Sequence, residues 1–556
     1  MIKFNKSVIL LSSLILIIFS ACHKKKNVDK IFYNGSIYLV NNNFSMVNAM
    51  AIVNGKIKET GNKDDILDDY NAKEVVDLHG ATIFPGFIDA HCHFYGYSTD
   101  LLKCDLFGTT SFDEVLSRLQ QYSTTNRFSW LLGRGWDQND WTDKVYPSNE
   151  KLDSLFPDIP VYIMRIDGHA AICNTKSLTI AGINTSTKVD GGEIIQKNGK
   201  LTGLLIDNAV DIVKKNIPAF TTDLIEQALL EGQANCFAAG LTTVDEAGLG
   251  KDSIFTLIDL QKKGTLKMRV YVMLSDDTAT LNYYYKNGPF KNERMNVNAI
   301  KMYADGALGS RGACMKKEYS DQKGHFGFLL HSLEYFNKIA DEALKYGFQL
   351  CTHAIGDSAN KVILNVYSDH LSTENHRRWR MEHCQVLDPK DRKLLSNYSI
   401  IPSVQPTHAT SDMYWVKDRI GADRMQYAYA YKDIHDECDN IIVLGTDFPV
   451  ENISPIYTFY AAVARKDLKG FPKNGFQSEN KLKRKDAIKA MTIQAAFSNF
   501  EEDEKGSLEE GKYADFVILD KDLMTIDDKD IPKTKVLATY VNGEKVFELK
   551  KEKKKN

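Results

Sequence analysis

Two histidines separated by one residue, His91 and His93, end the stretch "GFIDAHCH", which follows the apolar run "ATIFP". Because successive side chains of a strand point to opposite faces, the two imidazoles share one face, and Cys92 points away from it. Two imidazoles that converge on one point suit a divalent metal ion. A lone His-x-His motif also occurs by chance at a strand end, so the rest of the chain has to decide between these interpretations.

Polar residues also end later strand-like runs of the chain. Eight apolar runs alternate with helical stretches, which is the pattern of βαβ units. The runs are "IFPGFIDAHCH", "LTTVDEA", "MRVYVML", "AIKMYADG", "GFQLCTHA", "WRMEHCQ", "SIIPSVQP" and "NIIVLGTDFP". They predict an α/β fold of the (β/α)8 TIM-barrel type, in which catalytic residues stand at the carboxyl ends of the strands. After the histidine pair, the polar strand ends are Lys301, His353, His383 and Asp447.

These residue types suit metal-dependent hydrolysis. Imidazoles and carboxylates bind ions such as Zn²⁺, and a water molecule in an open coordination position can have its pKa lowered to near 7. The resulting hydroxide is a nucleophile, and Asp447 would both ligate metal and carry the water's proton to a leaving amine. Each residue alone has a structural alternative: His353 as a core histidine, Lys301 as a surface lysine, Asp447 as a helix N-cap. Six such residues in order on strand ends favour the site.

A long interval separates the first two predicted strands. A βαβ unit takes about 30 residues or more, whereas the interval from His93 to Thr242 is much longer and is rich in Gly, Trp and Tyr. Aromatic and glycine-rich loops over a catalytic face commonly shape substrate pockets, and a purely structural cap is the alternative. We predict an insertion at about 97–230 that covers the mouth of a barrel formed by 84–505.

The two ends of the remaining chain share a β-rich texture. Short β-rich runs broken by Asn-Gly and Gly fill 31–83, and "KYADFVILD" and "VLATYVNGEKVFEL" fill 506–548. Such runs are typical of hairpins. The two segments are therefore predicted to form one small domain.

The N-terminus has the layout of a secretory signal: lysines, an apolar stretch and small residues before Cys22. It resembles a bacterial lipoprotein signal, which implies removal of 1–21 and lipidation of Cys22, with 22–30 as a tether. The alternative is a transmembrane anchor, but the apolar stretch Ser7–Ala21 has 15 residues, fewer than the roughly 20 that span a bilayer. We expect a lipoprotein of the bacterial cell envelope that faces the periplasm or the exterior.

The composition is that of an ordinary soluble enzyme body, with 43% hydrophobic residues, 26% charged residues and a net charge of −3. Without a large basic excess, we expect no nucleic-acid partner, and we expect membrane contact through the lipid anchor only. The basic tail 549–556 is interpreted as solvated. Of the 9 cysteines, those other than Cys22 form no CxxC pair and resemble small buried hydrophobic residues. Their disulfide state and a homo-oligomeric state stay open.

Several motifs together resemble the amidohydrolase superfamily, and within it the amidohydrolase 3 (YtcJ-like) family. The motifs are "FPGFIDAHCH", "DGHAAICN", "IKMYADGALGSRGA", "THAIGD", "MEHCQ" and "LGTDFPV". The resemblance runs from the N-terminal strands to "GKYADFVILD" near the end. It implies a metal-dependent (β/α)8 barrel, an insertion after the first barrel strand, and a small β-sandwich made by both chain ends.

The resemblance also implies a binuclear metal site. A charged lysine has no lone pair for coordination and would repel cations, whereas a neutral amine can react with CO₂ to give a carbamate. A Lys301 carboxylated in this way would bridge two Zn²⁺ ions; other divalent ions and a single metal stay open. The first ion would be held by His91, His93 and Asp447, and the second by His353 and His383. His169 and Arg311 are candidates for substrate contact, and Asp305 for orienting a ligand.

The leading function is hydrolysis of a non-peptide C–N bond, in an amide or an N-formyl or N-acyl group of a small molecule. One alternative is a metal-dependent deaminase of a heterocyclic amine; by family analogy, that class needs no bridging lysine, so Lys301 argues against it. The other alternative is a ligand-binding lipoprotein without catalysis. Retention of all six polar strand ends argues against that alternative.

Overall fold

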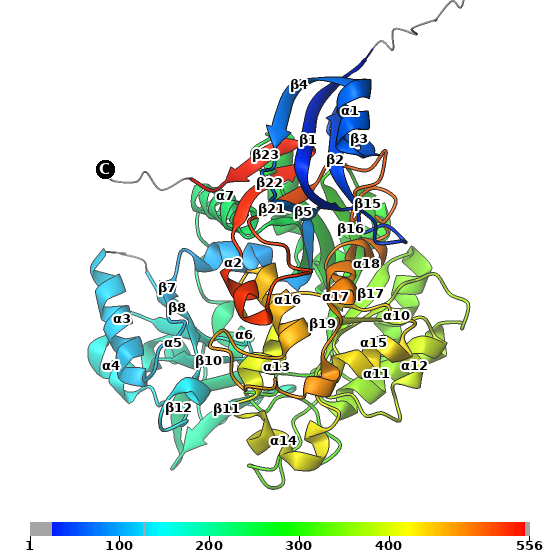
Figure 1. Ribbon diagram of the computed structural model, residues 1–556. Coiled ribbons are helices and arrows are strands. Elements are labelled where there is room, and N and C mark those ends of the chain that lie inside the picture. Colours follow the sequence, from blue (N-terminus) through cyan, green and yellow to red (C-terminus); the bar gives the residue numbers. More distant parts are fainter. Residues whose placement is uncertain (1–24, 126–128, 551–556) are drawn as a thin grey trace, which may run out of the picture.

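The structure is a computed structural model that describes residues 25–125 and 129–550 (Figure 1). The predicted signal, Cys22 and the last residues of the basic tail lie outside the described residues. Within them, no helix is both long enough and apolar enough to cross a membrane. None of the eight described cysteines is in a disulfide.

Eight parallel strands form the central barrel, and each is one of the eight runs singled out in the sequence. In chain order they are β6 (Phe87–Cys92), β13 (Leu241–Leu249), β14 (Arg269–Ser275), β16 (Met295–Tyr303), β17 (Gln349–Ala354), β18 (Arg380–His383), β19 (Ile401–Val404) and β20 (Val443–Leu444). Each strand pairs with the next along the chain. This confirms the predicted α/β barrel.

The seam between the last strand and the first is closed by backbone hydrogen bonds beyond β20. The Asp447 amide donates to the His91 carbonyl at 2.7 Å, and the His93 amide donates to the Phe448 carbonyl at 2.9 Å. Glycine is required at position 445 of this seam, because a Cβ there would lie only 2.5 Å from the backbone nitrogen of His91. The chain thus brings its first and last barrel strands together at the predicted metal ligands.

Helices surround the barrel, as Figure 1 shows. They are α2 (Phe94–Asp100), α7 (Thr222–Ala238), α8 (Lys251–Lys262), α9 (Thr278–Asn287), α10 (Leu333–Tyr346), α11 (Asp357–His370), α12 (Lys393–Asn397), α13 (Pro406–Asp412), α14 (Val416–Met425), α15 (Tyr431–Glu437), α16 (Pro455–Ala464), α17 (Arg484–Ala490) and α18 (Ile493–Ser498). The residues around α18 contact the barrel interior: Asn499 donates to Asp245 at 2.7 Å, and Gln349 donates to the Ser498 carbonyl at 2.9 Å. The amino-terminal end of the barrel is therefore filled, and its carboxyl end carries the candidate site.

Strands from both chain ends form one hydrogen-bonded sheet in the order β23-β22-β21-β5-β1-β2-β3, with β4 beside β1. Its elements are β1 (Lys26–Tyr38), β2 (Met46–Val53), β3 (Lys56–Gly61), α1 (Lys63–Asp69), β4 (Tyr70–Asp77), β5 (Thr82–Pro85), β21 (Phe516–Leu519), β22 (Val536–Val541) and β23 (Glu544–Glu548). Phe32 and Phe516, from opposite chain ends, pack edge to face with ring centroids 5.0 Å apart. Arg269 of the barrel donates to Asp515 at 2.6 Å, which ties this sheet to the barrel.

A second sheet of six strands lies within the segment predicted as an insertion. Its order is β11-β12-β10-β9-β8-β7. The segment comprises β7 (Cys104–Asp105), α3 (Phe112–Thr125), β8 (Leu131–Trp136), α4 (Glu150–Leu155), β9 (Val161–Arg165), β10 (Ala170–Cys173), α5 (Thr175–Ile180), β11 (Gly192–Lys197), β12 (Lys200–Asp207) and α6 (Asn208–Lys214). Trp136 is fully buried in the core of this segment. The segment therefore folds around apolar packing of its own and lies beside the barrel (Figure 1).

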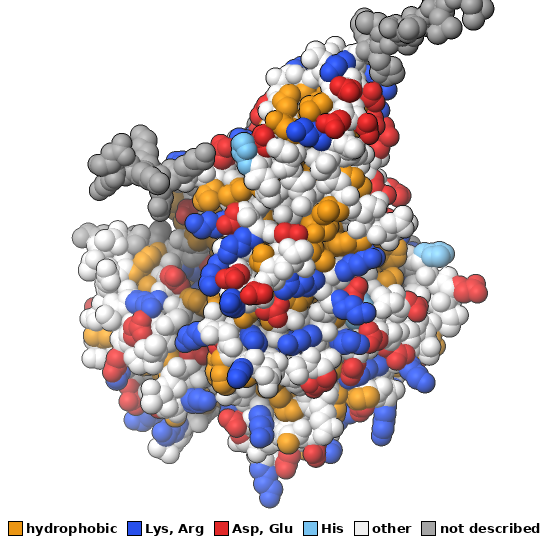
Figure 2. All heavy atoms as spheres, viewed as in Figure 1, with side chains coloured by type: hydrophobic (Ala, Val, Ile, Leu, Met, Phe, Trp, Pro, Cys, Tyr) orange, Lys and Arg blue, Asp and Glu red, His pale blue; other side chains and the backbone are white. Residues whose placement is uncertain are grey.

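On the face shown in Figure 2, acidic and basic side chains are interspersed between small hydrophobic areas.

Candidate metal centre

The residues predicted to bind metal stand at the carboxyl ends of the barrel strands. They are His91 on β6, His93 directly after β6, Lys301 on β16, His353 on β17, His383 on β18 and Asp447 shortly after β20. All but His93 are buried, and His93 keeps 28% of its side chain exposed. The fold thus gathers six residues that are far apart in the sequence.

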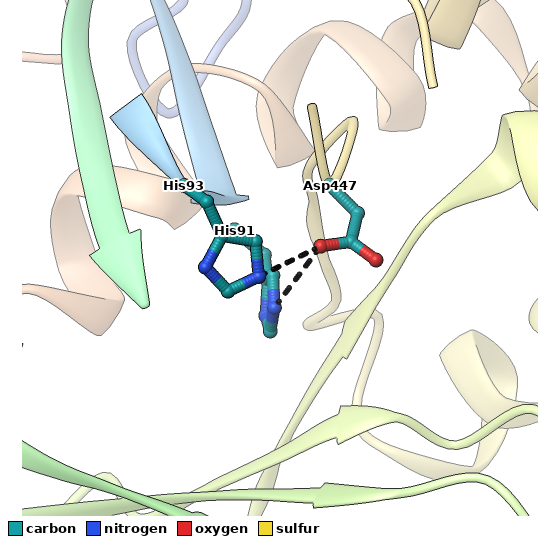
Figure 3. A group of neighbouring side chains, drawn as sticks. All are labelled: His91, His93 and Asp447. Carbon is teal, nitrogen blue, oxygen red and sulfur yellow. Dashed lines mark ion pairs between the residues drawn. The ribbon is translucent and has the colours of Figure 1, made fainter. Parts of the chain in front are cut away.

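His91, His93 and Asp447 form the first group of donor atoms (Figure 3). Asp447 Oδ1 lies 3.3 Å from His93 Nε2 and 3.6 Å from His91 Nε2. One potential ligand atom from each residue lies within 4.8 Å of the others. These separations place two imidazoles and one carboxylate around a single point.

Lys301 and two further histidines adjoin this group. Lys301 Nζ lies 3.2 Å from His91 Nε2. The His383 ring is 4.9 Å from the His91 ring and 4.5 Å from the His353 ring, measured between centroids. Burial lowers the pKa of the Lys301 ammonium, which favours the neutral amine that carboxylation needs. In the sequence, Lys301 lies between the pair His91 and His93 and the pair His353 and His383. In space, it lies beside His91.

The chemistry of these residues fits a divalent metal ion. Burial lowers the pKa of His91 to about 4 and that of His93, and it holds the pKa values of His353 and His383 well below the usual range. Neutral imidazoles have a lone pair for a metal. Among the described residues, His383 Nδ1 and Asp447 Oδ1 are buried without a hydrogen-bond partner. Buried polar atoms are rarely left in this state, and a bound cation would satisfy both.

A buried carboxylate that the sequence analysis missed orients His91. His91 Nδ1 lies 2.5 Å from Glu382 Oε2 and donates to it, since a carboxylate can only accept. Arg380 donates to the other oxygen of Glu382 at 2.8 Å. Despite burial, Arg380 and His91 hold the pKa of Glu382 well below its usual range. Glu382 thus fixes the ring so that Nε2 faces Lys301 and Asp447, as carboxylate partners of metal-binding histidines commonly do.

His408, which the sequence analysis left unassigned, contacts Asp447 directly. Its Nε2 lies 3.2 Å from Asp447 Oδ2, and its Nδ1 lies 3.0 Å from Glu451 Oε1. Although burial opposes protonation, the hydrogen bonds to Asp447 and Glu451 raise the pKa of His408 to about 10. His383, His408 and Asp447 also form a second group with potential ligand atoms within 4.8 Å of one another. The signal in the sequence was "QPTH" directly after the seventh strand.

Asp305 contacts both a backbone turn and a candidate ligand. Its carboxylate accepts from the amides of Ile355 and Gly356 at 3.0 and 2.8 Å, just after His353. Its Oδ1 also lies 3.5 Å from His353 Nε2. The position agrees with the orienting role considered for this residue.

The inserted segment brings His169 to the barrel mouth. The His169 ring is 5.3 Å from the His353 ring. Its Nδ1 lies 2.6 Å from Asp207 Oδ1, and the Asp207 amide donates to the His169 carbonyl at 2.8 Å. Although burial opposes it, this contact raises the pKa of His169. The predicted substrate contact of His169 therefore has a position beside the metal candidates, with Asp207 as a partner that the sequence did not reveal.

Arg311, the other candidate for substrate contact, is engaged elsewhere. Its guanidinium donates to both oxygens of Asp321, at 3.1 and 2.9 Å. It also lines a cavity of about 210 Å³ together with Tyr146, Glu193 and His325. The substrate contact predicted for Arg311 stays a prediction.

The fold and the site define an α/β-barrel protein with a candidate metal centre. Similarity to known proteins identifies its family. The chain matches the amidohydrolase family over residues 74–547. It therefore belongs to the amidohydrolase family. YtcJ of Bacillus subtilis is 31% identical over 536 residues, which cover 93% of this chain and 99% of that protein.

Two further relatives bear on the activity. The N-substituted formamide deformylase of Arthrobacter pascens is 23% identical over an alignment of 558 residues that covers 93% of this chain and 97% of that enzyme. A metal-dependent hydrolase from Pyrococcus horikoshii with a known crystal structure is 26% identical in sequence to this chain. Its structure matches that of this chain with a TM-score of 0.74, over 90% of this chain and 99% of that chain. The relatives thus support hydrolase activity that depends on a metal.

Proposed function

We propose that this protein hydrolyses a non-peptide C–N bond, in an amide or an N-formyl or N-acyl group of a small molecule. The observation that carries the proposal is the group of buried histidines and Asp447 at the barrel mouth, of which His383 Nδ1 and Asp447 Oδ1 have no hydrogen-bond partner among the described residues. The similarity to a formamide deformylase along nearly the whole chain supports an N-formyl or related amide as the substrate.

In this proposal two divalent ions, most simply Zn²⁺, are bound at the mouth. His91, His93 and Asp447 would hold the first, and His353 and His383 the second. Lys301 would bridge them after its neutral Nζ attacks CO₂, forming an N–C bond and releasing one proton, so that a carbamate replaces the amine. Bound ions would supply Lewis-acid polarisation of the substrate carbonyl and of water.

Asp447 is suited to move the proton of the reaction. Its Oδ2 is held by His408 at 3.2 Å, while Oδ1 faces His91 and His93. Asp447 would thus be held in place while it takes a proton from the attacking water and delivers it to the nitrogen of the leaving amine. Glu382 and Asp305 would keep the rings of His91 and His353 oriented, and His169 would contact the substrate.

The activity test uses metal-loaded protein with three substrate classes: N-formyl amines, N-acyl amines and heterocyclic amines. Release of formate or another carboxylate, with no ammonia from the heterocyclic amines, is the expected result. Ammonia release without carboxylate would identify a deaminase instead. Binding of these compounds without turnover of any would favour the ligand-binding alternative.

The proposed location is the bacterial cell envelope, with a lipid on Cys22 as the only membrane contact. The signal-like sequence before Cys22 supports this proposal. The proposed partner is a small molecule, and the balanced net charge of −3 offers no reason to expect nucleic acid.

A further inference from the structure

Gln405, directly after β19, has an unusual side chain for a barrel interior. It is 0% exposed, yet neither its Oε1 nor its Nε2 has a hydrogen-bond partner in the described part of the chain. Leaving a buried donor or acceptor unpaired is unfavourable, because the group has lost its hydrogen bonds to water and gained none. Both polar atoms of the Gln405 side chain are unpaired in the described part of the chain. The side chain is therefore suited to bind a ligand.

Strand alternation indicates where this side chain points. Ile401 packs in the barrel interior with Ile88 and Val443. Two residues later, Ser403 Oγ accepts from Arg380 at 3.0 Å inside the barrel. Because every second residue of a strand shares a face, Gln405 continues the interior row toward the carboxyl end.

The neighbours of β19 put Gln405 beside the metal candidates. Its strand lies between β18, which ends at His383, and β20, which leads to Asp447. The register pairs Glu382 with Ser403 and Val404 with Leu444, so Gln405 is the next position toward the mouth.

The backbone at this position is held while the side chain is not. The Gln405 carbonyl accepts from the His408 amide at 3.1 Å and from the Tyr431 hydroxyl at 3.3 Å. His408 in turn contacts Asp447. A fixed backbone that carries an unpaired amide is a preorganised binding group.

We propose that Gln405 binds the substrate's amide group and makes the site selective for secondary amides. Its NH₂ would donate to the substrate carbonyl, and its Oε1 would accept from the substrate N–H. A secondary amide in the cis arrangement offers both groups on one edge, as a lactam does, whereas a tertiary amide or an ester has no N–H. This inference rests on the proposed amide hydrolysis and names the substrate class within it.

The selectivity expected from this arrangement is substantial. A substrate without the N–H leaves Oε1 buried and unpaired, and sites built to hydrogen-bond a group strongly reject analogues that lack it. We expect wild-type kcat/KM for a secondary formamide to exceed that for its N-methylated counterpart by roughly tenfold or more, as one unmade buried hydrogen bond implies. Gln405→Met should bring this ratio close to one.

Binding measured by calorimetry separates this inference from the proposed hydrolysis. The probes are a simple lactam, its N-methyl derivative and the corresponding lactone, which lacks the N–H without added bulk. Wild-type protein should bind the lactam roughly tenfold more tightly than the other two, and Gln405→Met should lose this preference. The binding ratios report on Gln405 even if no amide is turned over.

Controls exclude a merely structural role. Gln349→Met removes a buried glutamine that donates to the Ser498 carbonyl at the other end of the barrel, so it should lower the melting temperature and leave the selectivity intact. Gln405→Met should not lower the melting temperature, since it removes unpaired polar atoms. Should Gln405→Met fail to fold, Gln405→Leu, which also removes both polar atoms, should show the same loss of preference for the lactam. Unchanged ratios in the Gln405 variants would overturn the proposal and would leave Gln405 with a buried water.

Discussion

At the scale of single residues, Asp447 is the point at which the site converges. One oxygen faces His91 and His93, and the other contacts His408 at 3.2 Å. Although burial opposes it, the contacts with His408 and His93 hold the pKa of Asp447 well below its usual range. The residue is therefore a carboxylate, which both metal binding and proton transfer require.

Asp447→Asn keeps the shape of this residue and removes its basicity. We expect kcat for the best amide substrate to fall by about 10²-fold or more, the usual contribution of a positioned base, with a smaller change in KM. Steady-state kinetics together with metal analysis test this expectation, and the exposed Asp252→Asn variant is the matched control. Near-normal turnover with intact metal content would refute the role of Asp447.

Glu382 offers a second test at the same scale, with metal affinity as the readout. Glu382→Gln weakens the contact that orients His91 and removes one of the two carboxylates that Arg380 contacts, the other being Asp245. Loss of such a carboxylate partner typically costs 10- to 100-fold in metal affinity, so a competing chelator should strip the variant at a correspondingly lower concentration. The exposed Glu374→Gln variant should behave as wild type. Equal affinities of Glu382→Gln and wild type would show that Glu382 does not position His91.

At the scale of elements, the mouth depends on loops that fit closely against one another. The loop after β16 passes over Asp207 of the inserted segment, and Cβ atoms at Gly306 and Gly312 would lie 2.4 and 2.2 Å from Asp207 Oδ2. The two glycines therefore allow the loop to approach the carboxylate that holds His169.

Gly312→Ala should disturb this contact. We expect a loss of about 1–3 kcal/mol in the free energy of unfolding, as for other overpacked sites, and a higher KM because His169 is displaced. Denaturant unfolding and steady-state kinetics measure the two effects. Gly61→Ala, at a position with nothing within 4 Å of the added Cβ, should change neither. A wild-type KM in Gly312→Ala would show that the contact with Asp207 does not influence substrate binding.

The elements also show what the sequence could predict. Alternating apolar runs identified all eight barrel strands, since buried parallel strands are apolar and end in polar residues at the mouth. The contact between His91 and Glu382 joins residues 291 positions apart, and no local pattern indicates such a pair. His408 was missed because it lies in a helix after a strand, and the pairing of Arg311 with Asp321 was likewise not indicated by any local pattern.

At the scale of the whole molecule, the closed barrel, the inserted segment and the two-ended sheet form the frame of a metal-dependent hydrolase. The first and last barrel strands meet at His91 and Asp447 through backbone hydrogen bonds. The candidate ligands therefore come together only when the barrel closes. This dependence couples metal binding to the folded state.

The proposed envelope location is a prediction about the whole protein. Replacing Cys22 by Ser removes the thiol that would carry the lipid, and lipid chains contribute roughly 0.8 kcal/mol per buried CH₂. Cell fractionation should find wild-type protein with membranes and Cys22→Ser protein in the soluble fraction. Equal distribution of the two proteins would contradict the lipoprotein proposal.

Metal stoichiometry tests the proposed binuclear centre that is bridged by Lys301. Protein prepared with bicarbonate and Zn²⁺ should contain close to two ions per chain, as in other two-metal hydrolytic sites. Lys301→Ala should lose at least one ion, and a small added carboxylic acid should partly restore its activity by replacing the carbamate. A wild-type content of one ion that is unchanged in Lys301→Ala would contradict the bridge.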